Sequence, residues 1–191
     1  MYDDLLQSNG LTPPDGVNLI KVSRPDKAIH AIKFIETLCT HTKGKWAGVK
    51  FRLLPWQYTL IWELFGTCKE NGKRQYRTCY VEIPKKNGKT ELGASIALLT
   101  LCGDGEQGAE IYSAAADKEQ AGLMYAVAAQ MVRNNPTLSS RLQVKDSVKR
   151  IIDYKSNSFY CALSSESFTK HGINPSDILF DELHAQPNDD K

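Results

Sequence analysis

The stretch YVEIPKKNGKTELGASIALL, residues 80–99, decides the fold because two structures compete for it. Asn87-Gly88 between polar residues is typical of a β-hairpin turn, since both residues tolerate positive φ. A hairpin needs a second strand after Thr90, but the residues that follow do not alternate between apolar and polar. They place three apolar side chains on one helical face: Leu92, Ile96 and Leu99. The pattern therefore favours a strand at residues 77–83, then a loop, then a helix.

The loop in this stretch contains Gly-Lys-Thr, which is typical of phosphate binding. The backbone N–H groups of residues 87–90 (Asn87, Gly88, Lys89 and Thr90) would point at the β-phosphate from a helix N-terminus, where the helix dipole favours an anion. Lys89 would reach the β- and γ-phosphates, and the Thr90 hydroxyl would bind Mg²⁺. The usual pattern has a glycine at the position of Ile83, and the next residue is a proline without an N–H. The front half of the loop must therefore have a different shape.

A second candidate feature is DILFDE, residues 177–182, about ninety residues after the loop. An apolar strand that ends in an acidic residue places a carboxylate where it binds Mg²⁺, and Asp181 has that position. Glu182 would deprotonate the attacking water in ATP hydrolysis. The competing interpretation is a helix N-terminus with its ordinary preference for acidic residues. The combination with Gly-Lys-Thr, in this order, favours the catalytic interpretation.

LLPWQ, residues 53–57, is a third candidate, for nucleobase recognition. Gln57, on a turn after Pro55 and Trp56, would offer its carboxamide to the edge of an adenine. The alternative is that Trp56 belongs to the core and Gln57 is a solvated helix residue. Beside the other two motifs, we favour adenine recognition.

The remaining chain alternates helices and strands. The first 25 residues, rich in proline and glycine, are expected to form an extended, partly mobile arm. Apolar spacing predicts helices at residues 26–38, 55–65 and 117–134, the last with Asp117 as its N-cap. Strands are expected at residues 108–116 and 178–180, with a hairpin formed by 150–154 and 158–165. This order indicates an α/β domain with a largely parallel, buried sheet.

Composition is that of an ordinary globular chain: 191 residues, 41% apolar, with a formal net charge of +2. Basic residues concentrate in one segment, which predicts a local positive surface: Lys69, Lys73, Arg74, Arg77, Lys85, Lys86 and Lys89. The five cysteines include no C-x-x-C pair, which is typical of a reduced, intracellular protein. Histidine spacing indicates no structural zinc, and no apolar run has the length of a membrane span or a secretory signal.

Taken together, these motifs resemble the large terminase subunit of tailed double-stranded DNA phages, the ATPase of the genome-packaging motor. The similar segments are FRLLPWQ, IPKKNGKT, YSAAADKEQA and HGINPSDILFDELHAQ, spread over residues 51–186. The second matches the family's variant Walker A motif, which also lacks the leading glycine, and the last surrounds Walker B. The resemblance implies a P-loop NTPase of the ASCE or RecA-like type, with helices flanking a mostly parallel sheet.

The resemblance also implies roles for single residues. Lys89 and Thr90 would bind phosphate and Mg²⁺, Asp181 would bind Mg²⁺, Glu182 would be catalytic, and Gln57 would contact adenine. Many terminases have arginine at the position of Lys85, where it senses the γ-phosphate; lysine keeps the charge but loses the bidentate fork. An arginine finger from a neighbouring subunit is also expected, and the candidates are Arg133, Arg141 and Arg150.

The implied biology is a homo-oligomeric ring that packages double-stranded DNA with a portal protein and a small terminase subunit. It would work in the host cytoplasm and transiently at the procapsid portal, away from membranes. We expect residues 1–50 to pack as an arm and helix on an ATPase core at residues 51–191, truncated after the Walker B strand. The nuclease domain of the family is expected to be absent, and the chain alone is expected to hydrolyse ATP weakly or not at all.

Two other functions compete with this one. DELH also fits the D-E-x-H box of superfamily-two helicases, although their loops carry more small residues before Gly-Lys-Thr. A non-hydrolysing DNA-binding module would use the basic segment at residues 69–89 to contact phosphates, with steep salt dependence.

Overall fold

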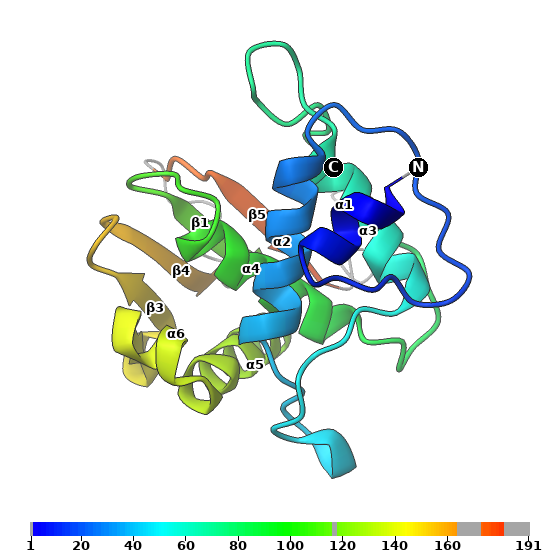
Figure 1. The fold of residues 1–191 in the computed structure, drawn as a ribbon. Coiled ribbons are helices and arrows are strands. Elements are labelled where there is room, and N and C mark those ends of the chain that lie inside the picture. The colour runs from blue at the N-terminus through cyan, green and yellow to red at the C-terminus, as the bar shows by residue number, and fades with distance from the viewer. Residues whose placement is uncertain (1, 116–117, 164–172, 182–191) are drawn as a thin grey trace, which may run out of the picture. The chain divides into compact units, whose positions relative to one another are not determined.

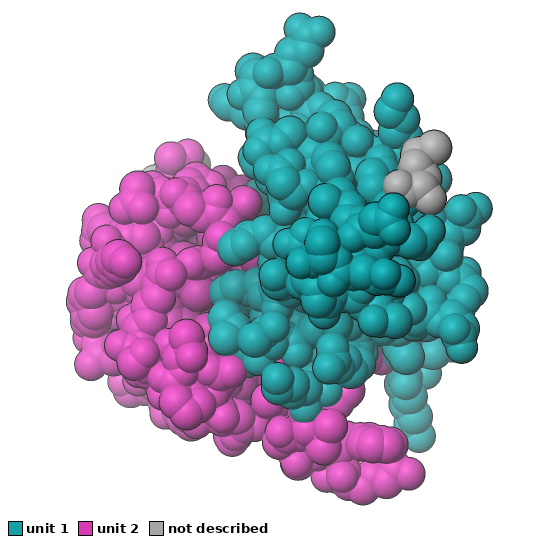
Figure 2. All heavy atoms as spheres, viewed as in Figure 1, with its two compact units in different colours: residues 1–38, 50–87 teal, residues 39–49, 88–191 magenta. Residues whose placement is uncertain are grey.

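The computed structural model describes residues 2–115, 118–163 and 173–181 (Figure 1). The chain divides into two compact units (Figure 2): unit 1 is Met1–Leu38 with Lys50–Asn87, and unit 2 is Cys39–Val49 with Gly88–Lys191. The boundary thus falls inside the Gly-Lys-Thr loop. The division into an arm and helix at residues 1–50 and an ATPase core at residues 51–191 stays a prediction.

Unit 1 is built from three helices, α1 (Asp3–Ser8), α2 (Pro25–Leu38) and α3 (Pro55–Gly66). The α2 and α3 helices confirm the predicted ones, and they pack against each other. The predicted apolar face of α2 is buried: Ala28, Ile29, Ile32 and Ile35. Pro55 begins α3, where its missing N–H costs no hydrogen bond.

The expectation of an extended N-terminal arm is wrong at residues 3–8, which form α1, whereas residues 11–24 contain no helix or strand. Leu6, in α1, is fully buried, and Val22 is also in the core. The Tyr2 hydroxyl accepts a hydrogen bond from the Val22 N–H at 3.2 Å, and its ring meets the Trp62 ring edge-on at 4.8 Å between centroids. Apolar residues at wide spacing gave no periodic signal, yet they fix this segment on unit 1.

The strand predicted at residues 77–83 is not formed. These residues pair with no described strand, and most of them are exposed, Tyr80 by 71%. The segment is rich in β-formers, but a strand needs a ladder partner, and propensity alone does not supply one. The opening interpretation of strand, loop and helix is therefore correct only for the loop and the helix.

Unit 2 contains a five-stranded mixed sheet with the order β2-β3-β4-β1-β5. Its strands are β1 (Glu110–Ala114), β2 (Leu142–Lys145), β3 (Arg150–Asp153), β4 (Ser158–Leu163) and β5 (Asp177–Phe180). β1 runs parallel to both β4 and β5, whereas β3 is antiparallel to β2 and β4. The sheet confirms the α/β class, the buried β1 and the β3–β4 hairpin, and it adds β2, which the sequence did not predict.

The helices of unit 2 are α4 (Lys89–Cys102), α5 (Lys118–Asn134) and α6 (Pro136–Arg141), with short 3₁₀ turns η1 (Gly44–Trp46) and η2 (Asp146–Val148). α4 and α5 pack against each other and against β1 and β4, and α4 also contacts β5. The predicted N-cap Asp117 lies outside the described residues. Tyr160 of β4 is fully buried, and its hydroxyl donates to the Ser113 hydroxyl at 2.8 Å, which ties the two central strands together.

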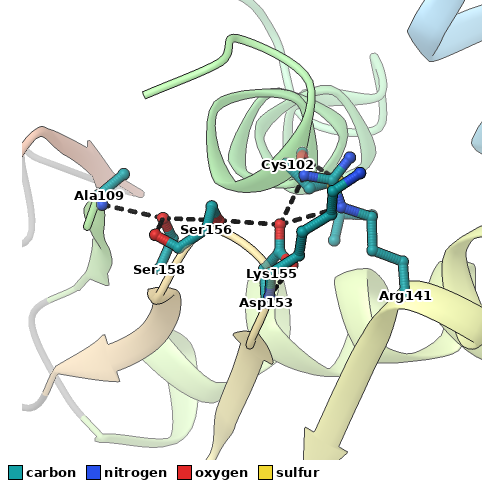
Figure 3. Close-up of polar contacts among 8 residues, drawn as sticks. Cys102, Ala109, Arg141, Asp153, Lys155, Ser156 and Ser158 are labelled. Carbon is teal, nitrogen blue, oxygen red and sulfur yellow. Dashed lines mark hydrogen bonds and ion pairs between the residues drawn. The ribbon is translucent and has the colours of Figure 1, made fainter. Parts of the chain in front are cut away.

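A polar network closes the β3–β4 hairpin (Figure 3). The fully buried Asp153 carboxylate accepts from Arg141 Nε at 3.0 Å, Arg141 Nη2 at 2.7 Å and the Ser156 hydroxyl at 2.9 Å. Ser158 extends the network to β1 by accepting the Ala109 N–H at 2.9 Å. Asp153 thus joins α6 to the hairpin, and the Ser156 and Ser158 hydroxyls, 2.9 Å apart, carry the network on to Ala109, the residue before β1.

All five cysteines are free thiols. Burial raises the pKa of the Cys39 and Cys102 thiols to about 12, so both stay protonated and inert. Among the described residues, every helix is either too short or too polar to cross a bilayer.

Candidate nucleotide-binding site

The Gly-Lys-Thr loop ends at the N-terminus of α4, as predicted. Gly88 is the N-cap with φ 80°, a left-handed conformation that glycine adopts without strain. Its carbonyl accepts the first helical hydrogen bond, from the Leu92 N–H at 3.0 Å. Because a helix begins directly after the loop, the hairpin interpretation of Asn87-Gly88 is wrong.

The front half of the loop turns back on itself. Lys86 has φ 67°, an uncommon conformation for a residue with a side chain. The Asn87 carboxamide donates to the Pro84 carbonyl at 3.1 Å, which closes the turn. The front half of the loop therefore turns without a glycine at position 83. Lys85, Lys86 and Asn87 are all exposed.

The second turn of α4 lies near Leu179 of β5, and the two elements pack against each other. A Cβ atom built on Gly93 would be 3.9 Å from Leu179 Cδ2. Gly93 is one helical turn after Thr90, and Leu179 is two residues before Asp181. The Asp181 N–H donates to the Ala114 carbonyl at 2.9 Å, so Asp181 continues the β5 ladder at its carboxyl end. Unit 2 therefore packs the helix that begins at Lys89 beside the strand that precedes Asp181.

Lys89, Thr90 and Asp181 are all partly exposed. Hydroxyl and carboxylate oxygens are ligand types that Mg²⁺ prefers, so Thr90 and Asp181 fit that metal. Glu182, the predicted catalytic base, lies outside the described residues.

Gln57, in unit 1, has a structural role that the sequence did not predict. It is fully buried, and its Oε1 accepts from the Leu54 N–H at 2.9 Å, which caps α3. Within the described part of the chain, its Nε2 has no hydrogen-bond partner. Trp56 is partly exposed. The alternative prediction, with Trp56 in the core and Gln57 solvated, is therefore wrong, because Gln57 is the buried residue of the two. Among the described residues its Nε2 donor has no acceptor.

Glu91 is a neighbour of the site that sequence reasoning missed. It follows Thr90 in the first turn of α4, and its carboxylate reaches two residues about fifty positions earlier. Oε2 lies 2.8 Å from His41 Nδ1, and Oε1 accepts the Thr42 N–H at 3.1 Å. No sequence signal links these residues, because the contact depends on how residues 39–49 fold onto unit 2.

The three arginine-finger candidates all have partners within unit 2. Arg133 pairs with Asp146, and Arg141 is bonded to the buried Asp153. The Arg150 guanidinium lies 4.3 Å from the centroid of the Phe159 ring. Each would have to leave these contacts to reach a neighbouring subunit.

Comparison with known proteins agrees with this arrangement. The family described as "Terminase large subunit, ATPase domain" matches residues 55–191. The large terminase subunit of Enterobacteria phage HK97 is 35% identical over 152 residues, which cover 79% of this chain and 29% of that protein. The crystal structure of the HK97 large terminase matches with a TM-score of 0.70 and 33% identity, over 82% of this chain and 31% of that chain. The chain thus spans under a third of the length of these relatives. Its fold is that of a P-loop NTPase, and the chain belongs to the family of terminase large-subunit ATPase domains.

Proposed function

We propose that this protein binds and hydrolyses Mg-ATP at the N-terminus of α4. The observation that carries the proposal is the packing of α4 against β5, where a Cβ atom on Gly93 would be 3.9 Å from Leu179 Cδ2. It supports a shared site for the Gly-Lys-Thr residues and Asp181. Mg²⁺, when bound, would neutralise charge on the β- and γ-phosphate oxygens.

In this proposal each residue of the site has one task. The amides of Asn87 and Gly88 face the phosphates, and Lys89 neutralises the β- and γ-phosphates. Thr90 and Asp181 hold the metal. Glu182 takes the proton of the water that attacks the γ-phosphorus, and Lys85 places a cation near the γ-phosphoryl oxygens in the transition state, while ADP is the leaving group.

We propose that Gln57 contacts the adenine through Nε2. The support is the buried donor without a partner in the described residues, since such groups are rare in folded proteins. Because Oε1 is occupied by Leu54, only a donor remains for the base. Trp56, beside it and partly exposed, would add apolar contact.

For the complete motor we propose that hydrolysis drives double-stranded DNA into the procapsid. The subunits would form a homo-oligomeric ring that works with the portal protein and the small terminase subunit in the host cytoplasm. Family membership supports this proposal, and no comparison favours a helicase or a non-hydrolysing module.

Thermal unfolding with a non-hydrolysable ATP analogue and Mg²⁺ tests nucleotide binding. At a hundredfold excess over Kd the analogue should add about 2.7 kcal/mol of stability. For a chain of this size that raises Tm by roughly 5–10 °C. The shift should vanish in Lys89→Ala and persist in Lys69→Ala, which removes an exposed lysine outside the loop. An equal shift in both variants would overturn the site.

A further inference from the structure

Residues 41–49 of unit 2, which we call the basic loop, form a closed and ordered projection. The His41 N–H donates to the Val49 carbonyl at 2.8 Å, and the Gly48 N–H donates back to the His41 carbonyl at 2.9 Å. η1 fills the tip. Figure 1 shows this cyan loop extending away from the helices and sheet of its own unit. Two backbone bonds at its base therefore hold the tip out in solvent.

The tip of the basic loop combines positive charge with an exposed aromatic ring. Lys43 and Lys45 are exposed, and Trp46 is 55% exposed. The Lys45 Nζ lies 5.1 Å from the centroid of the Trp46 ring. No acidic residue occurs between Glu36 and Glu63, so no neighbour in sequence neutralises these cations.

The base of the basic loop is attached to the nucleotide-binding helix. Glu91 Oε2 contacts His41 Nδ1 at 2.8 Å, and Glu91 Oε1 accepts the Thr42 N–H at 3.1 Å. Both side chains of the ion pair are about three-quarters covered, with 26% and 21% exposed. On the other side, Asn134 of α5 donates to the Thr40 hydroxyl at 3.0 Å. Glu91 is next to Thr90, so the loop is joined to the turn that faces the phosphates.

We propose that the basic loop binds the phosphate backbone of duplex DNA and that Glu91 couples this contact to nucleotide bound at the N-terminus of α4. The inference rests on the proposed function and assigns a surface and a coupling residue to it. A shift of the first turn of α4 moves Glu91, and through Glu91 it moves the loop. By linkage, DNA on the loop must then change nucleotide affinity by the same factor.

Duplex DNA fits this surface better than an acidic protein does. A stable protein–protein interface covers about 800 Å² on each partner and has an apolar centre. A nine-residue projection with two lysines and one ring lacks such a centre. Phosphate contacts need less area, because each one gains free energy from released counterions.

Salt dependence of DNA binding tests the contact. The test uses a blunt duplex of random sequence and plots the logarithm of the DNA association constant against the logarithm of the salt concentration. This slope is negative, and in Lys43→Gln/Lys45→Gln its magnitude should be smaller by about 1.8, since each phosphate contact contributes about 0.9. The matched control is Lys69→Gln/Lys73→Gln, which removes two exposed lysines from another loop and should leave the slope near the wild-type value. Trp46→Ala should weaken binding without changing the slope. No measurable binding by the wild type, or equal slopes for both double variants, would overturn the contact.

The coupling is measured as the ratio of DNA affinities with and without the Mg²⁺ complex of a non-hydrolysable ATP analogue. In the wild type this ratio should differ from one by roughly 5-fold or more, as for other coupled sites. Glu91→Ala should bring it close to one while each ligand still binds alone. Asp146→Ala removes an exposed carboxylate from the same unit and should keep the wild-type ratio.

His41→Ala breaks the same contact from the side of the loop and should reproduce the Glu91→Ala result. A wild-type ratio of one, or a ratio unchanged by both variants, would overturn the coupling. Loss of the proposed function would show differently, because the analogue would then fail to protect the wild type against heat.

Discussion

Gly93 of α4 leaves room for Met124 of α5: a Cβ atom on residue 93 would be 2.7 Å from Met124 Cε. The same atom would be 3.9 Å from Leu179 Cδ2 of β5, an ordinary van der Waals contact, so α4, α5 and β5 all come close at this position. This meeting point lies about one helical turn after Thr90, which we propose to hold the metal. We expect the packing there to influence the distance between Thr90 and Asp181.

The effect of substituting Gly93 on the free energy of unfolding should depend on the size of the new side chain. In Gly93→Ala the methyl group meets the flexible end of Met124, and a helix-propensity gain of about 1 kcal/mol offsets the repacking. We expect stability close to that of the wild type. Gly93→Leu overpacks the junction, so we expect a loss of about 1–3 kcal/mol.

The same Gly93→Leu variant should bind the Mg-ATP analogue more weakly, because it pushes α4 away from β5. Chemical denaturation gives the stability, and titration calorimetry gives the affinity. Wild-type affinity in a folded Gly93→Leu variant would contradict a site shared by α4 and β5.

Glu182→Gln should abolish ATP hydrolysis by the complete motor and leave ATP binding largely intact. The amide keeps similar bulk but cannot accept the proton of the attacking water. Phosphate release and nucleotide affinity are measured on the same variant. Turnover within tenfold of the wild type would exclude Glu182 as the base.

Gln57→Ala should weaken the preference for ATP over GTP. The free Nε2 donor can serve adenine N1, which is an acceptor, whereas guanine carries an N–H at that position. A neutral hydrogen bond contributes about 0.5–1.5 kcal/mol, so we expect a change of roughly 2- to 13-fold in the ratio of the two affinities. The variant also loses the cap at the Leu54 N–H, but the ratio is independent of that stability loss.

The matched control for Gln57 is Thr59→Ala, which removes a hydroxyl that bonds the Pro55 carbonyl in the same helix. Its nucleotide preference should equal that of the wild type. Equal weakening of ATP and GTP by Gln57→Ala would place Nε2 at N7, which both purines share, and would contradict the predicted loss of preference. Unchanged affinities for both would remove Gln57 from the site.

The sequence predicted the elements whose signals are local. The apolar face of α2, the proline at the start of α3 and the buried strand β1 each depend on spacing within a few residues, and all three are confirmed. The choice between a hairpin turn and a loop before a helix at Asn87-Gly88 was predicted correctly, because the residues after Thr90 do not alternate between apolar and polar. The α4 helix is thus readable from sequence alone.

The structural features that the sequence did not predict depend on contacts between residues that are distant in sequence. Residues 77–83 have β-forming side chains, but no described strand pairs with them. The attachment of Tyr2 to Trp62, and of His41 to Glu91, joins residues at least fifty positions apart. Gln57 was assigned a ligand role, yet half of its carboxamide is used to cap its own helix. Such assignments need the tertiary structure.

The Arg141–Asp153 pair should stabilise unit 2 measurably, unlike the exposed ion pairs. Asp153 is fully buried at the hairpin, and Arg141 donates to it twice. Arg141→Met keeps the alkyl packing but leaves the carboxylate with Ser156 and the Lys155 N–H as donors. Since hydrogen bonds to charged groups contribute about 1.5–3 kcal/mol, we expect a loss of that size in urea unfolding. Arg24→Met breaks a pair that is exposed on both sides and should cost less.

The pH dependence of that loss identifies the carboxylate. Burial pushes the pKa of Asp153 upward, but the hydrogen bonds from Arg141 and Ser156 outweigh it, so the pKa lies below the ordinary value of 3.8. A group with a lowered pKa in the folded state stabilises the protein above its unfolded pKa and stops doing so as the pH falls through the folded one. The difference in unfolding free energy between the wild type and Arg141→Met should therefore be constant from about pH 8 to 5 and shrink below about pH 4. Asp26 and Asp146 also have lowered pKa values, but they titrate alike in both proteins and cancel in the difference. A difference that stays constant down to pH 2 would assign the stabilisation to Arg141 packing rather than to its charge.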